Sequence, residues 1–226
     1  MKRIRLYIVC ALVCFLYFES FAQNEIGLIP QINSDFKIAE QWKLNSKFEG
    51  RQIFFKNPYP EGRKQREFDR FDVELIATKR LDPINTWGGG YLIRRSDGAF
   101  THRFIQQYAI TQKLLTSRIA HRFRTDQTVE KDEAIQLRLR YRISWEKPLN
   151  GLEVDPGEFY LKINNEYLGI LQDSKGDMEI RGLASLGYDI SDKNKIETGV
   201  DYRVENLMNP GPKHLLFLSI GLYHSF

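Results

Sequence analysis

Cysteine is almost absent from this chain of 226 residues, which contains only two, Cys10 and Cys14. Both lie near the start, so disulfides cannot hold the rest of the chain together. Long apolar runs are also missing, because beyond residue 22 no stretch approaches the roughly 18 consecutive apolar residues that a membrane-spanning helix needs. The net charge of +4 is too small to predict nucleic-acid binding. These absences exclude a disulfide scaffold and a helical membrane protein.

The chain begins with the features of a signal peptide, residues 1–22. Lys2 and Arg3 precede the apolar run Leu6–Phe18, and the small residues at a peptidase site are Ser20 and Ala22. We therefore expect cleavage near Ala22 and export of the remaining chain. An N-terminal membrane anchor is the alternative, and it is less favoured because the apolar run is too short to span a bilayer comfortably.

Apolar and polar residues alternate through the rest of the chain. Between Ile135 and Trp145 every second residue is apolar, and Arg138 and Arg140 are among the residues between them. This period of two predicts a β-strand with one apolar and one charged face. Similar runs, separated by turn residues, predict one all-β domain of about ten antiparallel strands over residues 40–226. Residues 23–39 are a lead-in segment, a segment in the lumen, or an extra hairpin that would give about twelve strands.

The alternation does not say which face of the strands lies inside. A soluble barrel buries the apolar face, whereas an outer-membrane barrel turns it to lipid and lines its lumen with the charged face. An even number of strands places both chain ends on the periplasmic side, and Trp42, Trp87 and Trp145 then gather at the periplasmic rim. Membrane interfaces favour aromatic residues, and the terminal Phe226 is a further interface residue. We predict an up-and-down transmembrane β-barrel with a charged lumen in the cell outer membrane.

The charged faces give the candidate site. Pairing the two strands on either side of residues 127–132 would place Arg122 opposite Arg138 and Arg118 opposite Arg142, and like charges in such positions repel. Carboxylates from other strands must compensate, which predicts a salt-bridged plug. The candidate lumen residues are Arg118, Arg122, Arg138, Arg140, Arg142, Glu166, Glu179 and Arg181. The network either only fills the barrel or binds an anion such as a phosphate, sulfate or carboxylate group, for which the planar guanidinium is suited.

Motifs for catalysis or metal binding are missing. The histidines lack metal-ligand spacings such as HExxH, and Gly88-Gly89-Gly90 lacks the Lys-Ser/Thr of a phosphate loop and indicates a bend or close approach in a barrel wall. Ser96 near His102, and Ser117 near His121, leave a lipid-modifying hydrolase as an alternative without an acid partner. A soluble periplasmic barrel that carries lipid is another alternative. We predict no catalytic residues, metal or cofactor, and no nucleic-acid partner.

Several stretches of the sequence resemble a known family. They are WKLNSKFEGRQI (42–53), FDRFDVEL (68–75), GGGYLIRR (88–95), RFIQQYAI (103–110), SRIAHRFR (117–124), QLRLRYRISWEKPL (136–149), GEFYLKINNEYL (157–168), IRGLASLGYDIS (180–191) and HLLFLSIGLYHSF (214–226). By their order and spacing they resemble the domain of unknown function 2490 family, predicted outer-membrane β-barrels of Gram-negative bacteria. The resemblance implies a location and a fold but no catalytic residues. The partners we expect are outer-membrane lipid and the barrel-assembly machinery, which would act through the C-terminal strand.

Overall fold

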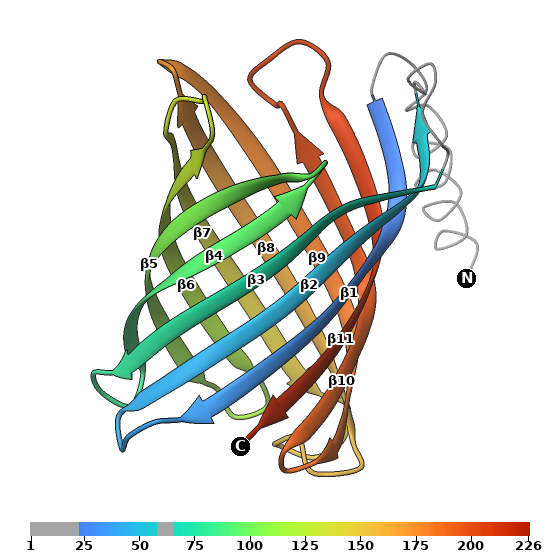
Figure 1. The fold of residues 1–226 in the computed structure, drawn as a ribbon. Helices are drawn as coiled ribbons and strands as arrows, with labels where there is room; N and C mark the ends of the chain where they lie inside the picture. Colours follow the sequence, from blue (N-terminus) through green and yellow to red (C-terminus); the bar gives the residue numbers. More distant parts are fainter. Residues whose placement is uncertain (1–22, 58–65) are drawn as a thin grey trace, which may run out of the picture.

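The described part of the chain folds into a closed barrel of eleven β-strands (Figure 1). This computed structural model describes residues 23–57 and 66–226, and the expected signal peptide lies outside the described residues. The strands are β1 (Gln23–Lys37), β2 (Trp42–Asn57), β3 (Glu67–Arg80), β4 (Asn85–Ser96), β5 (Ala99–Lys113), β6 (Arg118–Glu130), β7 (Gln136–Pro148), β8 (Phe159–Gln172), β9 (Lys175–Ser191), β10 (Asn194–Glu205) and β11 (Lys213–Ser225). None of the described residues forms a helix long and apolar enough to cross a membrane. The predicted all-β barrel is confirmed.

The barrel closes where the first strand meets the last. β1 pairs with β11 in parallel, from Gln23 beside Lys213 to Asp35 beside Ser225, whereas all other neighbours are antiparallel. An odd number of alternating strands always leaves one neighbouring pair pointing the same way, and in this barrel it is β1 and β11. As a result β1 begins at one end of the barrel, the upper end in Figure 1, and Phe226 lies at the other, the lower end.

The first strand corrects the boundaries expected from the sequence. Residues 23–37 are neither a lead-in nor a hairpin, because β1 pairs along its length with β2 and β11 and belongs to the wall. The barrel therefore starts at residue 23 instead of residue 40. The described residues form eleven strands, a number between the two that the sequence suggested, and Gln23 and Phe226 lie at opposite ends of the barrel.

A proline explains why β1 is inconspicuous in the sequence. Ile26 and Ile32 are exposed on one face of the strand and Ile29 is buried on the other, which is the alternation of a barrel strand. Pro30 lies between them, and it has no backbone N–H to donate to a neighbouring strand. The register between β1 and β2 accordingly skips Ile29 and Pro30.

Tight turns join the strands at both ends. The β4–β5 turn is Asp97-Gly98, with φ angles of 49° and 81°, and the β8–β9 turn is Asp173-Ser174, with 49° and 60°. Two-residue turns with positive φ match the twist of the flanking strands. In the β3–β4 turn the Asp82 carboxylate accepts hydrogen bonds from the Asn85 side chain and from the backbone N–H groups of Ile84 and Asn85, which hold its pKa below the usual value.

Glycines let β4 lie close against β3. A Cβ atom at Gly88 would lie 2.5 Å from the carbonyl oxygen of Ala77, and one at Gly90 would lie 2.2 Å from that of Leu75. Gly89 lies between them on the other face, and a Cβ there would have its nearest neighbour at 3.4 Å. The close approach in the wall that the sequence indicated is therefore present.

The apolar core inside the barrel is small. It consists of two clusters on the inner wall, Ile29 with Leu215 and Phe217, and Ile76 with Leu92 and Ile105. The guanidinium groups of Arg51 and Arg203 lie over the Phe217 ring, 4.7 and 5.6 Å from its centroid. Polar and charged side chains fill most of the remaining interior.

Candidate functional site

The charged faces of the strands point into the barrel. In β7, Leu137 and Leu139 are 47% and 64% exposed, whereas Arg138 and Arg140 are 8% and 7% exposed. The same alternation recurs in the other strands, since outward apolar side chains are exposed and inward polar ones are buried. The lumen is charged, as the sequence predicted.

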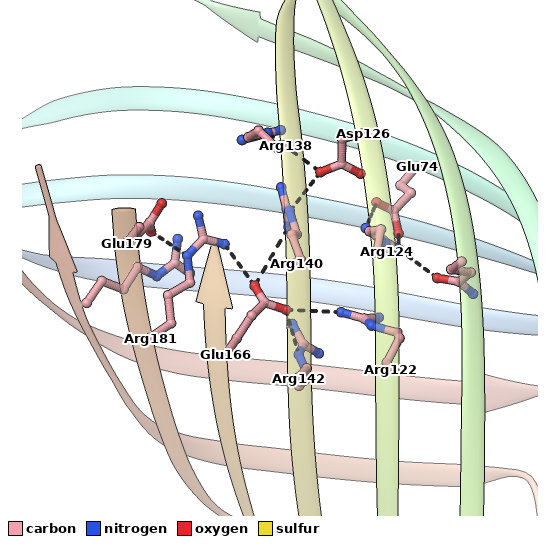
Figure 2. A network of polar contacts seen from close by, with 12 residues as sticks. Glu74, Arg122, Arg124, Asp126, Arg138, Arg140, Arg142, Glu166, Glu179 and Arg181 are labelled. Carbon is pink, nitrogen blue, oxygen red and sulfur yellow. Dashed lines mark hydrogen bonds and ion pairs between the residues drawn. The ribbon is translucent and has the colours of Figure 1, made fainter. Parts of the chain in front are cut away.

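Glu166 on β8 is the centre of a buried ion-pair network (Figure 2). Arg142 Nε donates a hydrogen bond to Glu166 Oε2 at 2.8 Å, and Arg122 Nη2 donates to the same oxygen at 3.3 Å. Arg181 and Arg140 lie 3.5 and 3.7 Å from Oε1. One carboxylate therefore faces guanidinium groups from β6, β7 and β9, which ties three strands to β8.

Two further carboxylates extend the network along the barrel (Figure 2). Asp126 on β6, whose side chain is fully buried, lies 2.7 Å from Arg140 Nε and 3.6 Å from Arg138 Nε. Glu179 on β9 pairs with Arg181 on the same strand. Asp126 is thus shared between two arginines of β7, and its carboxylate lies closer to Arg140 than to Arg138.

Other contacts, like that of Arg122 with Glu166, join strands that are not neighbours in the wall. Arg124 on β6 donates hydrogen bonds to both oxygens of Glu74 on β3, at 3.0 and 3.1 Å, and a third to Gln107. Lys162 on β8 donates to Glu197 on β10 at 2.8 Å. Because β4 and β5 separate β3 from β6, the first pair reaches across the interior and helps to close the lumen.

The register of β6 and β7 differs from the one expected. Arg122 lies opposite Arg142 and not Arg138, and Arg118 lies opposite Glu146 and not Arg142. The reason is that β6 continues through the residues taken for a loop and the turn comes later in the chain. Arginines still face one another across the two strands, and the carboxylates of Glu166, Asp126 and Glu74 supply the compensating charge.

The structure brings all but one of the predicted lumen residues into this network. The exception is Arg118, which lies at the lower end and pairs with Glu146 at 2.9 Å. Sequence reasoning missed Arg124 and Asp126 as members of the candidate site. Both lie on the charged face of β6, and the alternation of that strand, which continues to Thr128, is the signal that could have added them.

A cavity of about 780 Å³ remains between the ion pairs. Basic side chains outnumber acidic ones in its lining, and the residues come from every strand of the barrel. Among residues 23–57 and 66–226, no group of three or more His, Cys, Asp and Glu side chains is arranged to hold a metal ion. The chemistry that the interior offers is that of paired and partly paired guanidinium groups.

The three tryptophans and Phe226 lie at the lower end of the barrel. Trp42 and Trp87 lie at the beginnings of β2 and β4 and are exposed, and Trp145 lies near the end of β7. Phe226 stacks on Phe36, with ring centroids 4.5 Å apart. The aromatic residues singled out from the sequence therefore share one rim of the barrel.

Three histidines on the outer face are paired with tyrosines of the neighbouring strand. The pairs are Tyr91–His102, Tyr141–His121 and Tyr202–His214, each between the hydroxyl and Nδ1. The geometry is diagonal, since Tyr141 lies directly opposite Phe123 while His121 lies opposite Ile143. Diagonal neighbours across two strands are within reach of long side chains. Each pair gives a polar group on an apolar surface a hydrogen-bond partner.

Comparisons with known proteins identify a family and nothing more specific. A family model described as "Protein of unknown function (DUF2490)" matches residues 30–211, which extend from within β1 to the connection before β11. Comparison with curated proteins and with solved structures found no match. Because the family model covers most of the barrel, this chain belongs to the DUF2490 family of proteins of unknown function.

Proposed function

We propose that this protein is an integral outer-membrane β-barrel whose lumen is closed by its ion-pair network. The observation that carries the proposal is the reversal of the usual burial pattern. Side chains such as Leu161, Val200 and Leu218 are 40%, 52% and 48% exposed around the wall, while arginines and carboxylates are buried inside. Soluble monomers rarely expose a continuous apolar surface of this extent, whereas lipid favours it.

Two features of the outer surface support the proposal. Exposed aromatic side chains lie near both rims, with the tryptophans at the lower one and Phe54, Phe68 and Phe100 at the upper one, and membrane interfaces favour aromatic residues. The tyrosine–histidine pairs satisfy polar groups that would otherwise meet hydrocarbon, which offers no hydrogen bonds. The strand number gives no support, because bacterial outer-membrane barrels have even numbers of strands and this barrel has eleven. With an odd number, the first and last strands no longer place both chain ends in the periplasm.

The proposed orientation puts the lower end in the periplasm. Phe226 and the three tryptophans lie at that end, and the outward residues of β11 are Leu216, Leu218, Ile220 and Leu222. In this orientation β11 presents an apolar, aromatic-ended strand to the barrel-assembly machinery, and the exposed belt contacts outer-membrane lipid. β1 then begins on the outer side.

Membrane fractionation tests the location. The protein should remain in the outer-membrane pellet after washing with carbonate or concentrated salt and should dissolve only in detergent. Unheated samples should migrate differently from boiled ones on a gel, as a folded barrel does. Release by salt alone, or recovery as a monodisperse species without detergent, would count against the proposal.

The two other functions considered from the sequence gain no support from the geometry. Ser96 Oγ donates to the Asp69 carbonyl inside the barrel, whereas His102 is bonded to Tyr91 on the outer face. His121 Nδ1 contacts the Tyr141 hydroxyl, not a serine. A lipid carrier needs an apolar interior, and this one is charged. An unchanged lipid A mass profile in a deletion strain would remove the hydrolase.

A further inference from the structure

A second cavity lies at the upper end of the barrel. It has a volume of about 260 Å³, and the side chains of Arg70, Arg94, Arg103 and Arg138 line both this cavity and the larger one, so they stand between the two. Glu130 is the one acidic residue among the described residues that line the smaller cavity. Its walls therefore gather positive charge from β3, β4, β5 and β7.

Two of these arginines are already neutralised. Arg94 donates two hydrogen bonds to Asp72, at 2.7 and 2.5 Å. Arg70 donates to Asp69 at 2.5 Å. Each guanidinium thus has a carboxylate within hydrogen-bond distance, although Asp69 also lies 3.8 Å from Arg51 Nε.

The other two arginines lack such a carboxylate. Arg103, which is 4% exposed, donates from Nε to the neutral hydroxyl of Thr128 at 3.0 Å, and no carboxylate of the described residues lies within ion-pairing distance of it. Arg138 lies 3.6 Å from Asp126, which Arg140 holds at 2.7 Å. Arg138 Nε and Nη2 are buried and make no hydrogen bond to any described residue. Both guanidinium groups are more than nine-tenths buried.

The charge balance of the whole network points the same way (Figure 2). The ion pairs described above involve six arginines, Arg122, Arg124, Arg138, Arg140, Arg142 and Arg181, and four carboxylates, Glu74, Asp126, Glu166 and Glu179. Arginine does not lose its proton in proteins, so the excess positive charge is permanent. Buried charge is tolerated when it is paired, which favours an anion beside the least paired guanidinium groups.

We propose that Arg103 and Arg138 bind a phosphate-class oxyanion, as free phosphate or as a phosphomonoester, in the upper cavity. The planar guanidinium forks match the oxygens of a tetrahedral anion, and the cavity is below the size usual for larger organic ligands. Of the lumen residues named from the sequence, Arg138 alone belongs to this site, because carboxylates within the barrel pair the others. The proposal goes beyond the membrane location and does not depend on it.

Calorimetry with inorganic phosphate tests the site. The full mature chain, folded in detergent and free of phosphate, should bind phosphate saturably. Arg103→Gln removes the charge but keeps a hydrogen-bonding amide, and it should weaken binding roughly tenfold or more. Arg118→Gln is the matched control, because Arg118 is at the opposite end with a carboxylate partner, and it should bind as the natural protein does. Equal affinities for the two variants, or no saturable binding by the natural protein, would overturn the proposal.

Further measurements detect misfolded variants and distinguish free phosphate from a phosphomonoester as the bound anion. Arg103→Lys keeps the charge and should recover part of the affinity, while heat-modifiable migration verifies that each variant is folded. Tighter binding of glycerol 3-phosphate than of inorganic phosphate would indicate a phosphomonoester, and the reverse would indicate the free ion. Acetate or chloride binding as tightly as phosphate would overturn the proposal. If the protein proves soluble without detergent, the same titration in buffer still decides the site.

Discussion

Asp126 is the residue on which the upper part of the network depends. Its fully buried carboxylate pairs with Arg140 and Arg138, and no other carboxylate of the described residues lies within ion-pairing distance of Arg138. Asp126→Asn removes the charge at nearly constant volume and leaves two buried arginines less compensated. We expect the free energy of unfolding to fall by about 3 kcal/mol or more, measured by urea unfolding in lipid vesicles.

The control for this prediction is Asp132→Asn in the exposed β6–β7 turn. Asp132 has a φ of 61°, a conformation that asparagine tolerates, so that substitution should change the stability little. A similar loss for the two variants would mean that the carboxylate of Asp126 is not the source of the stability.

At the scale of the strand, β7 offers a test of the proposal that the outer face meets lipid. Ile143 lies near the middle of the strand and faces outward with 36% exposure. Ile143→Lys should lower the stability in bilayers by about 2–4 kcal/mol, because a charge at mid-membrane depth is costly. Leu152→Lys, in the exposed β7–β8 connection, is the control and should be nearly neutral. Equal stabilities in vesicles would argue that Ile143 faces water.

The contact between β4 and β3 gives a second prediction at this scale. Gly90→Ala would place a Cβ 2.2 Å from the Leu75 carbonyl oxygen, so the two strands must move apart. Gly89→Ala adds the same methyl group with its nearest neighbour at 3.4 Å. We expect Gly90→Ala to reduce the midpoint of urea unfolding well below that of Gly89→Ala. The opposite order would contradict the close packing of the two strands.

For the whole molecule, closure by a parallel pair is the feature most open to test. In this register Ile32 lies beside Leu222 and Ile26 beside Leu216. The double variant Ile32→Cys with Leu222→Cys should therefore form a disulfide on oxidation, which a shift in gel migration of the unfolded chain would report. Native cysteines should not compete in this cross-linking, because Cys10 and Cys14 both lie within the expected signal peptide.

The matched control pairs Ile26→Cys with Leu222→Cys. These positions lie far apart along the parallel pair and should not cross-link, whereas an antiparallel arrangement of β1 could bring them together. Cross-linking of Ile26 with Leu222, in place of Ile32 with Leu222, would show that the barrel closes differently.

The sequence by itself determined the kind of strand and showed that each strand has one charged and one apolar face. A period of two is a local property, so Leu137, Arg138, Leu139 and Arg140 identify a two-faced strand without any knowledge of its neighbours. Turn residues such as Asp97-Gly98 are equally local, because positive φ is a preference of the residues themselves. These signals sufficed for an all-β barrel and for a charged face opposite an apolar one.

Only the tertiary structure decided how the barrel closes and which charges meet. The parallel seam between β1 and β11 joins residues almost the whole chain apart, and no local pattern encodes it. The partners of Glu166 come from three strands, and their approach depends on the register and curvature of the wall. For the same reason the sequence could name Arg138 but not Arg103: whether a buried guanidinium lacks a carboxylate depends on distances across the lumen, which only closure of the barrel fixes.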